Sequence, residues 1–190
     1  MVINYKRCLK CNSLDSAKIM YGYPAGDVTQ LMEEGKIILG GCAITNLSPE
    51  YHCNNCGHEW SKEDARDAEY EKILGISASV GGFWNGQYNE GIDFISRELK
   101  WSHIGSGHDE HYNKIIRQST LDKLREELKL IDILKWKSKY TDWDVCDGTQ
   151  WEVELIREGR NIKKYGSNVF PESWDSFCRL ISKVSGKSFY

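Results

Sequence analysis

Two pairs of cysteines with identical spacing constrain this chain more than any other feature of its sequence. They are Cys8-Leu-Lys-Cys11 and Cys53-Asn-Asn-Cys56. A Cys-x-x-Cys turn lets two sulfurs reach one ion, so the two pairs together offer four thiolates at tetrahedral positions. Zn²⁺ takes this arrangement in structural sites. The spacing therefore predicts one metal site built from both ends of the first sixty residues.

The residue after each pair indicates that both pairs share one backbone geometry. Asn12 follows the first pair and Gly57 follows the second. A left-handed backbone here turns amide groups toward the sulfurs, and glycine and asparagine adopt it most readily.

The alternatives to a shared metal site are two unrelated thiol pairs and a catalytic dithiol. A redox pair normally begins a helix beside a βαβ pattern, and this sequence has no such pattern around either pair.

The segment from Cys8 to Trp60 resembles a zinc ribbon with rubredoxin-like knuckles, and it covers about a third of the chain. The resemblance implies structural zinc on the four cysteines but no particular function, because ribbons serve many partners. The 41 residues between the pairs depart from compact ribbons, which have about 15–20. Iron is the alternative metal, since it also accepts four thiolates, and it would make the protein an electron carrier.

The long insert between the cysteine pairs is expected to be ordered. Residues 24–35 predict a short helix that begins at Asp27 and ends at a glycine. Residues 36–44 predict a strand with a glycine bend, in which Cys42 would be a small buried core residue. His52 and His58 flank the second pair and are alternative ligands, although the four cysteines already complete a set.

The expected fold is α+β. It consists of a zinc ribbon with an inserted helix over residues 1–60, a connecting helix over 61–75 and an α+β domain over 76–190. In the last of these, Asn85-Gly86 and Glu158-Gly159 mark hairpin turns between strand-like segments. Apolar stripes at helical spacing predict one helix beginning near Ser119 and a final one near Pro171. The pattern favours an antiparallel sheet with two helices packed on one face.

Composition narrows the class of protein and its location. The chain is 40% hydrophobic and 28% charged, as globular proteins are. It has no run of roughly 18 apolar residues for a membrane helix, and its first residues lack the apolar stretch of a signal peptide. We therefore expect a cytoplasmic protein without membrane contact. Disulfides are rare in that reducing compartment, which favours metal binding by the paired cysteines.

The charge distribution disfavours a nucleic acid as the main partner. Residues 1–75 carry eight lysines and arginines against eleven acidic residues, and residues 76–190 carry seventeen of each. Neither part is the basic surface that binding to a phosphate backbone requires. A local patch of Lys135, Lys137 and Lys139 would still be able to touch phosphates. We expect a protein partner instead.

Tryptophans are concentrated in the larger domain, where six of the seven occur. Large aromatic side chains fill the cores of small domains, and this is the first interpretation. The functional alternative is an aromatic-lined groove for a ligand or partner. Trp84 and Trp143 are the candidates for such a groove, because both lie in polar, turn-rich stretches.

An acidic turn and a polar loop support a second hypothesis, an enzyme. Asp142, Asp144 and Asp147 would bind a divalent cation or act as acid and base. Ser167 and Asn168 would direct polar groups toward a ligand at the start of the final helix. Together they would form the site of a hydrolase or transferase of unknown substrate. The alternative is a solvated turn and a loop that leads into the helix.

The sequence contains no established catalytic motif: no Walker loop, no GxGxxG, no HExxH and no GxSxG. The blocks DGTQW and YGSNVFP, with YGYP and GGC upstream, resemble uncharacterised bacterial two-part proteins. That resemblance implies no activity. The sequence thus favours a non-enzymatic binding or adaptor protein, held together by zinc and acting on another protein. A nucleic-acid-associated zinc ribbon protein is a further alternative.

Overall fold

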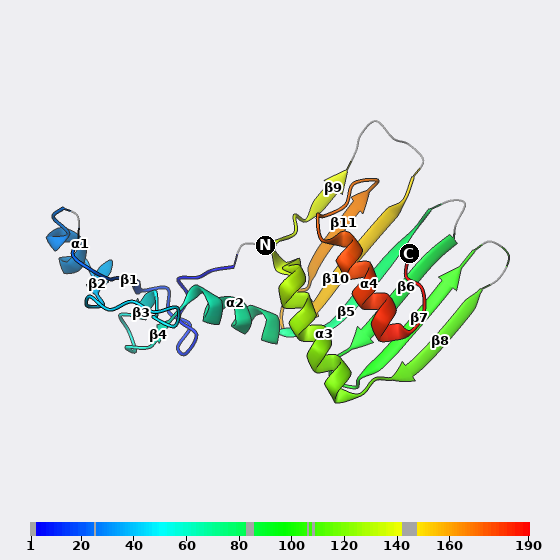
Figure 1. The fold of residues 1–190 in the computed structure, drawn as a ribbon, viewed down its shortest axis with the longest axis horizontal. Coiled ribbons are helices and arrows are strands. Elements are labelled where there is room, and N and C mark those ends of the chain that lie inside the picture. The colour runs from blue at the N-terminus through cyan, green and yellow to red at the C-terminus, as the bar shows by residue number, and fades with distance from the viewer. Residues whose placement is uncertain (1–2, 25, 83–85, 106, 108, 142–147) are drawn as a thin grey trace. The chain divides into compact units, whose positions relative to one another are not determined.

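The computed structural model describes residues 3–24, 26–82, 86–105, 107, 109–141 and 148–190 (Figure 1). They fall into two compact units, which we call the N-terminal unit (Ile3–Glu69) and the C-terminal unit (Tyr70–Tyr190). Each unit has its own mostly antiparallel sheet, and helices accompany both, so the expected α+β class is confirmed. Within the described residues, no helix combines the length and apolar character needed to span a bilayer.

The N-terminal unit is built on a four-stranded sheet in the order β2-β1-β3-β4. Its strands are β1 (Ser16–Met20), β2 (Ile37–Leu39), β3 (Tyr51–Cys53) and β4 (Glu59–Trp60). β1 pairs with β2 in parallel, and the other pairings are antiparallel. β1 buries Ala17 and Ile19 and exposes Lys18, as expected of a strand with one covered face. This sheet brings the two cysteine pairs of the sequence together.

The insert between the cysteine pairs contains the expected helix. α1 (Thr29–Glu33) begins where Asp27 accepts a hydrogen bond from the Thr29 amide at 2.9 Å, and it ends before Gly35, whose φ is 65°. Two expectations for the insert are wrong. The strand stops at Leu39, and the chain then turns at Gly41, whose φ is 81°; Cys42 is exposed instead of buried.

α2 (Lys62–Glu71) begins with a reciprocal cap. The Ser61 hydroxyl accepts a hydrogen bond from the Asp64 amide at 3.1 Å, and the Asp64 carboxylate accepts one from the Ser61 amide at 2.8 Å. Two amides at the helix start are thereby satisfied. The cap predicted from the sequence is confirmed, and the helix ends four residues earlier than its expected limit at residue 75.

The C-terminal unit contains a seven-stranded sheet in the order β8-β7-β6-β5-β10-β11-β9. Its strands are β5 (Ile73–Gly82), β6 (Gly86–Asp93), β7 (Glu98–Ile104), β8 (Glu110–Ile115), β9 (Lys139–Thr141), β10 (Gln150–Arg157) and β11 (Ile162–Ser167). Only β9 runs parallel to its neighbour, β11. β8 and β9 therefore form the two edges of this sheet.

Two helices cover one face of this sheet, as the sequence predicted: α3 (Gln118–Ile131) and α4 (Trp174–Ser185) (Figure 1). A short 3-10 helix, η1 (Ile133–Lys135), follows α3. Each helix buries an apolar stripe against strands whose inward residues alternate with polar ones. Four tryptophans lie in this core, namely Trp101, Trp136, Trp151 and Trp174. They fill it as large aromatic side chains do in small domains.

Candidate metal centre

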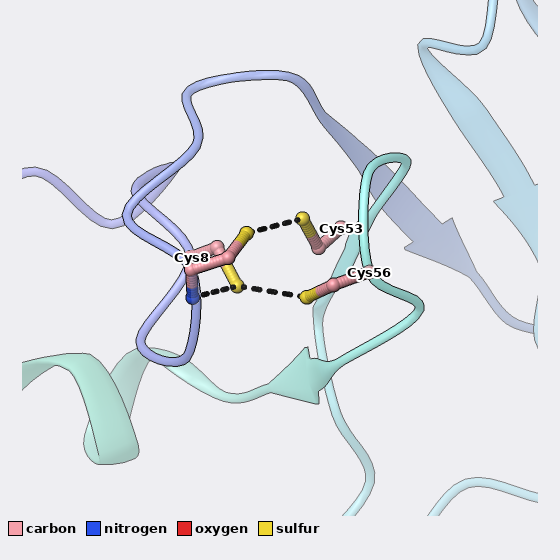
Figure 2. A group of neighbouring side chains, drawn as sticks. Cys8, Cys53 and Cys56 are labelled. Carbon is pink, nitrogen blue, oxygen red and sulfur yellow. Dashed lines mark hydrogen bonds between the residues drawn. The ribbon is translucent and has the colours of Figure 1, made fainter.

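Four cysteine sulfurs from the two ends of the N-terminal unit meet in one cluster (Figure 2). All four lie within 4.8 Å of one another. Two contacts join the two pairs: Cys8 Sγ lies 3.6 Å from Cys56 Sγ, and Cys11 Sγ lies 3.5 Å from Cys53 Sγ. Tetrahedral Zn–S bonds of about 2.3 Å place sulfurs about 3.8 Å apart, whereas a disulfide needs about 2.05 Å. The spacing therefore fits four thiolates around one shared ion.

Both cysteine turns have the left-handed residue that the sequence predicted. Asn12 has a φ of 60° and Gly57 a φ of 69°. The amide of Asn12 donates to the carbonyl of Cys8 at 3.0 Å, and the amide of Gly57 donates to that of Cys53 at 2.9 Å. The two knuckles thus use the same turn, 45 positions apart in the sequence.

A second backbone bond closes each knuckle in the same way. The Cys8 amide donates to the Ser13 carbonyl at 2.9 Å, and the Cys53 amide donates to the His58 carbonyl at 2.8 Å. Each bond spans five residues, so the two knuckles share both of these backbone bonds. This repeated geometry gives two similar cysteine pairs whose sulfurs meet in one cluster.

Amide donors favour a negative charge at the sulfurs. The Ser13 backbone amide, and then the Asn55 side-chain amide at 3.7 Å, lower the pKa of Cys11 to about 6. The pKa of Cys56 is raised to about 12: the His58 amide favours its thiolate, but burial and the neighbouring thiols outweigh it. Four crowded thiols cannot all ionise without a counter-charge. The cluster therefore fits a divalent cation, which would remove the mutual repulsion of four thiolates.

The first cysteine of each pair is fully buried, and the second lies nearer the surface. Cys8 and Cys53 pack with Trp60, whose indole N–H donates to the Tyr5 carbonyl at 2.8 Å. The Tyr51 ring stacks on the same indole with centroids 5.7 Å apart. This buried cluster has four members, and two of them are cysteines of the site. Metal binding in such a unit contributes directly to folding.

The two flanking histidines are engaged away from the sulfurs. The His52 ring lies 3.1 Å from the Glu59 carboxylate, its partner across the β3–β4 ladder. The His58 ring stacks on Trp60 with centroids 6.0 Å apart. Among the described residues, the group of possible metal ligands consists of the four cysteines alone. The geometry therefore favours an all-sulfur site over one in which a histidine replaces a cysteine.

In the polar loop of the enzyme hypothesis, Ser167 and Asn168 form hydrogen bonds with neighbouring residues. Ser167 Oγ accepts a hydrogen bond from Gln150 Nε2 at 2.7 Å, and Asn168 Oδ1 accepts one from the Thr149 amide at 2.8 Å. Asn168 also has a φ of 56°, so it forms a turn at the end of β11. The other candidates of this domain, Trp84, Trp143, Asp142, Asp144 and Asp147, lie outside the described residues.

Glu90 and Lys164 are among the buried charged residues, and the sequence analysis did not single them out. Glu90 faces the helices from β6, where burial raises the pKa of its carboxyl group to about 8. Lys164 faces them from β11 and donates to the carbonyls of Leu134 and Trp136, and burial lowers the pKa of its amine to about 8. Both occupy inward positions of a period-two pattern. In a strand every second side chain faces the same side, so this alternation in the sequence could have identified Glu90 and Lys164 as inward-facing.

The described fold and site define a protein of two α+β units, one of which carries a four-cysteine cluster compatible with a zinc knuckle. Comparison of the chain with models of known protein families finds no match, and comparison with curated proteins finds none either.

Proposed function

We propose that the four cysteines bind one structural Zn²⁺ and that the protein acts by binding another protein. The observation that carries the first part is the closed set of four sulfurs within 4.8 Å. Catalytic zinc sites keep a position for water or substrate, whereas a site with four thiolates has none open. When bound, the ion stabilises the fold by neutralising the thiolates. The chemistry of such a site is therefore structural.

The proposed protein-binding surface is the insert between the knuckles. Tyr23 and Leu47 are 98% and 91% exposed, and other apolar side chains of the same insert are exposed as well. These are Leu14, Leu31, Met32, Leu39 and Ile44. Exposed apolar side chains that gather in one segment are typical of interaction sites, whereas scattered single ones are ordinary. A partner that covers them would gain hydrophobic burial without ordering a disordered segment.

Metal analysis tests the first part of the proposal. Inductively coupled plasma mass spectrometry of the purified protein should return one zinc per chain, and the solution should be colourless. An iron-loaded form would be red, and it would replace structural zinc with the electron-transfer alternative. A protein purified without any metal, and unable to bind added Zn²⁺, would contradict the proposal.

Affinity capture with matched variants tests the second part. A double variant, Tyr23→Ser with Leu47→Ser, should lose proteins that the parent retains from a lysate of the native host. Leu130→Ser is the control, because Leu130 is 83% exposed but lies on α3 of the C-terminal unit. Identical retention by all three forms would argue against the insert as the binding surface. Strong, salt-sensitive binding to generic DNA or RNA in a filter assay would instead favour the nucleic-acid alternative.

A further inference from the structure

The edge strand β8 has backbone N–H and C=O groups that do not pair with any other described strand. It spans six residues, contains no proline, and pairs with β7 along its whole length (Figure 1). None of the other described strands pairs with it. Edge strands expose rows of N–H and C=O groups that can pair with another chain, so natural sheets normally shorten, charge or cover them. The outer edge of β8 is therefore suited to bind another extended strand by backbone hydrogen bonds.

The register identifies which backbone groups point outward. The Ile116 amide donates to the Arg97 carbonyl at 2.9 Å, so this pair is one of the bonded pairs of the β7–β8 ladder. Bonded and non-bonded pairs alternate in antiparallel sheets, so Lys114 and Tyr112 also bond to β7. The residues between them direct their N–H and C=O groups away from β7: they are His111, Asn113 and Ile115.

The usual protection of an edge is weak along β8. Its one lysine, Lys114, does not guard the edge, because its amine donates to the Ser185 carbonyl at 2.7 Å. Ile115 is 62% exposed on the open face of the sheet, and Tyr112 is 37% exposed on the helix-covered face. Apolar side chains thus flank the free backbone groups on both faces. An added strand would cover them while it satisfies the backbone.

We propose that a second copy of this chain pairs with β8 in antiparallel orientation, about a two-fold axis at Asn113. This register places each Asn113 opposite the other and each His111 opposite Ile115 of the second copy. The three residues whose backbone groups point away from β7 then lie opposite the same three residues of the second copy. Each of these three pairs forms two backbone hydrogen bonds, which gives six. A shift of one residue places outward groups against inward ones, and a shift of two leaves only two pairs.

The side chains are self-complementary in this register, which favours a second copy over an unrelated strand. On the open face, the His111 ring covers Ile115 of the second copy, and the two Asn113 amides can bond to each other. On the other face, Tyr112 lies opposite the aliphatic stem of Lys114 of the second copy. No like charges stand opposite one another. Cross-strand pairs of these kinds stabilise sheets.

The resulting dimer would have one continuous sheet with the helices of both copies on the same side, because the axis runs perpendicular to the sheet. Both copies contribute the same surface, as in most two-fold dimers. A contact along six residues is small beside the roughly 1,200 Å² that stable complexes bury. We therefore expect association that depends on concentration and a dimer that dissociates on dilution.

Sedimentation analysis of the full zinc-loaded chain, from about 10 μM to about 1 mM, tests the proposal. The mass of the parent protein should rise toward twice that of the chain. Asn113→Pro should remain a monomer, because it removes an outward N–H and blocks pairing without touching a β7 bond; proline is tolerated at such positions. Asn113→Ala is the matched control, and it should dimerise, since the backbone does the pairing.

Crosslinking tests the register independently. Bonded antiparallel partners have Cα atoms about 5.5 Å apart, within the range of a disulfide. Asn113→Cys should therefore give a covalent dimer on mild oxidation. Lys100→Cys is exposed on the same face but lies on β7, one strand in from the edge, and should give no more than the parent. A parent protein that stays monomeric at all concentrations overturns the proposal. So does a proline variant, folded by circular dichroism, that dimerises as well as the parent.

Discussion

Cys8 Sγ lies 3.6 Å from Cys56 Sγ, although 48 positions separate the two residues in the sequence. The contact closes the N-terminal unit, because it joins the first knuckle to the second across the whole insert. The insert contributes α1 and β2 between these points. A cation bound at the cluster would therefore link the start of the unit to the strands that complete its sheet.

Removing one buried ligand should cost the N-terminal unit its metal and its fold. We expect Cys53→Ser to lower the zinc content from one per chain to near zero, because a three-thiolate site binds the ion much more weakly. Limited proteolysis should then cut within residues 3–69 while residues 70–190 resist. Cys42→Ser is the control, since Cys42 is exposed and outside the cluster, and it should keep its zinc. Equal zinc loss in both variants would contradict this assignment.

The left-handed knuckle residues should tune metal affinity. Asn12→Ala forces alanine into a φ of 60°, which costs about 1 kcal/mol. That is roughly a fivefold loss of zinc affinity in competition with a chelator. Asn12→Gly should bind zinc at least as well as the parent, because glycine accepts this backbone freely. A loss of affinity in the glycine variant would show that the asparagine side chain, and not its backbone, matters.

Glu90 should make the stability of the protein depend on pH. The pKa of its carboxyl group is raised from 4.5 to about 8, chiefly by burial, with smaller opposing effects from Ser185 and Lys114. The folded chain then holds a proton that the unfolded chain has released. The free energy of unfolding should therefore fall as the pH rises from 4.5 through 8. Between about pH 6 and pH 9 we expect a loss on the order of 1–3 kcal/mol.

Urea denaturation at both pH values measures this effect, and Glu90→Gln supplies the comparison. The variant should lose less stability than the parent over the same interval, because the amide does not titrate. An unchanged pH dependence in the variant would mean that another group is responsible.

Replacing Lys164 should lower the free energy of unfolding more than replacing its neighbour Lys163. Lys164→Met leaves the carbonyls of Leu134 and Trp136 buried without their donor. We expect a loss of about 1–3 kcal/mol in the free energy of unfolding. Lys163→Met is the matched control, because it removes only an exposed ion pair with Glu152 at 2.8 Å and should change stability by less than about 1 kcal/mol. Urea denaturation at neutral pH compares the two, and equal effects would refute the role given to Lys164.

The sequence by itself determined the local features of this protein. The cysteine spacing and the residues after each pair predicted two matching turns, and Asn12 and Gly57 adopt them. The Ser61 cap and the apolar stripe of the final helix were predicted in the same way. These features depend on residues within a few positions of each other, so backbone preference and periodicity are sufficient to indicate them.

Only the tertiary structure decided which distant segments meet. It brings the sulfurs of the two knuckles together, aims Asn55 at Cys11, and leaves Cys42 exposed. It also turns Glu90 and Lys164 inward, and it leaves β8 at an edge. Local patterns carry no information about which strand pairs with which, because that choice depends on the summed packing and hydrogen bonding of residues far apart in the chain.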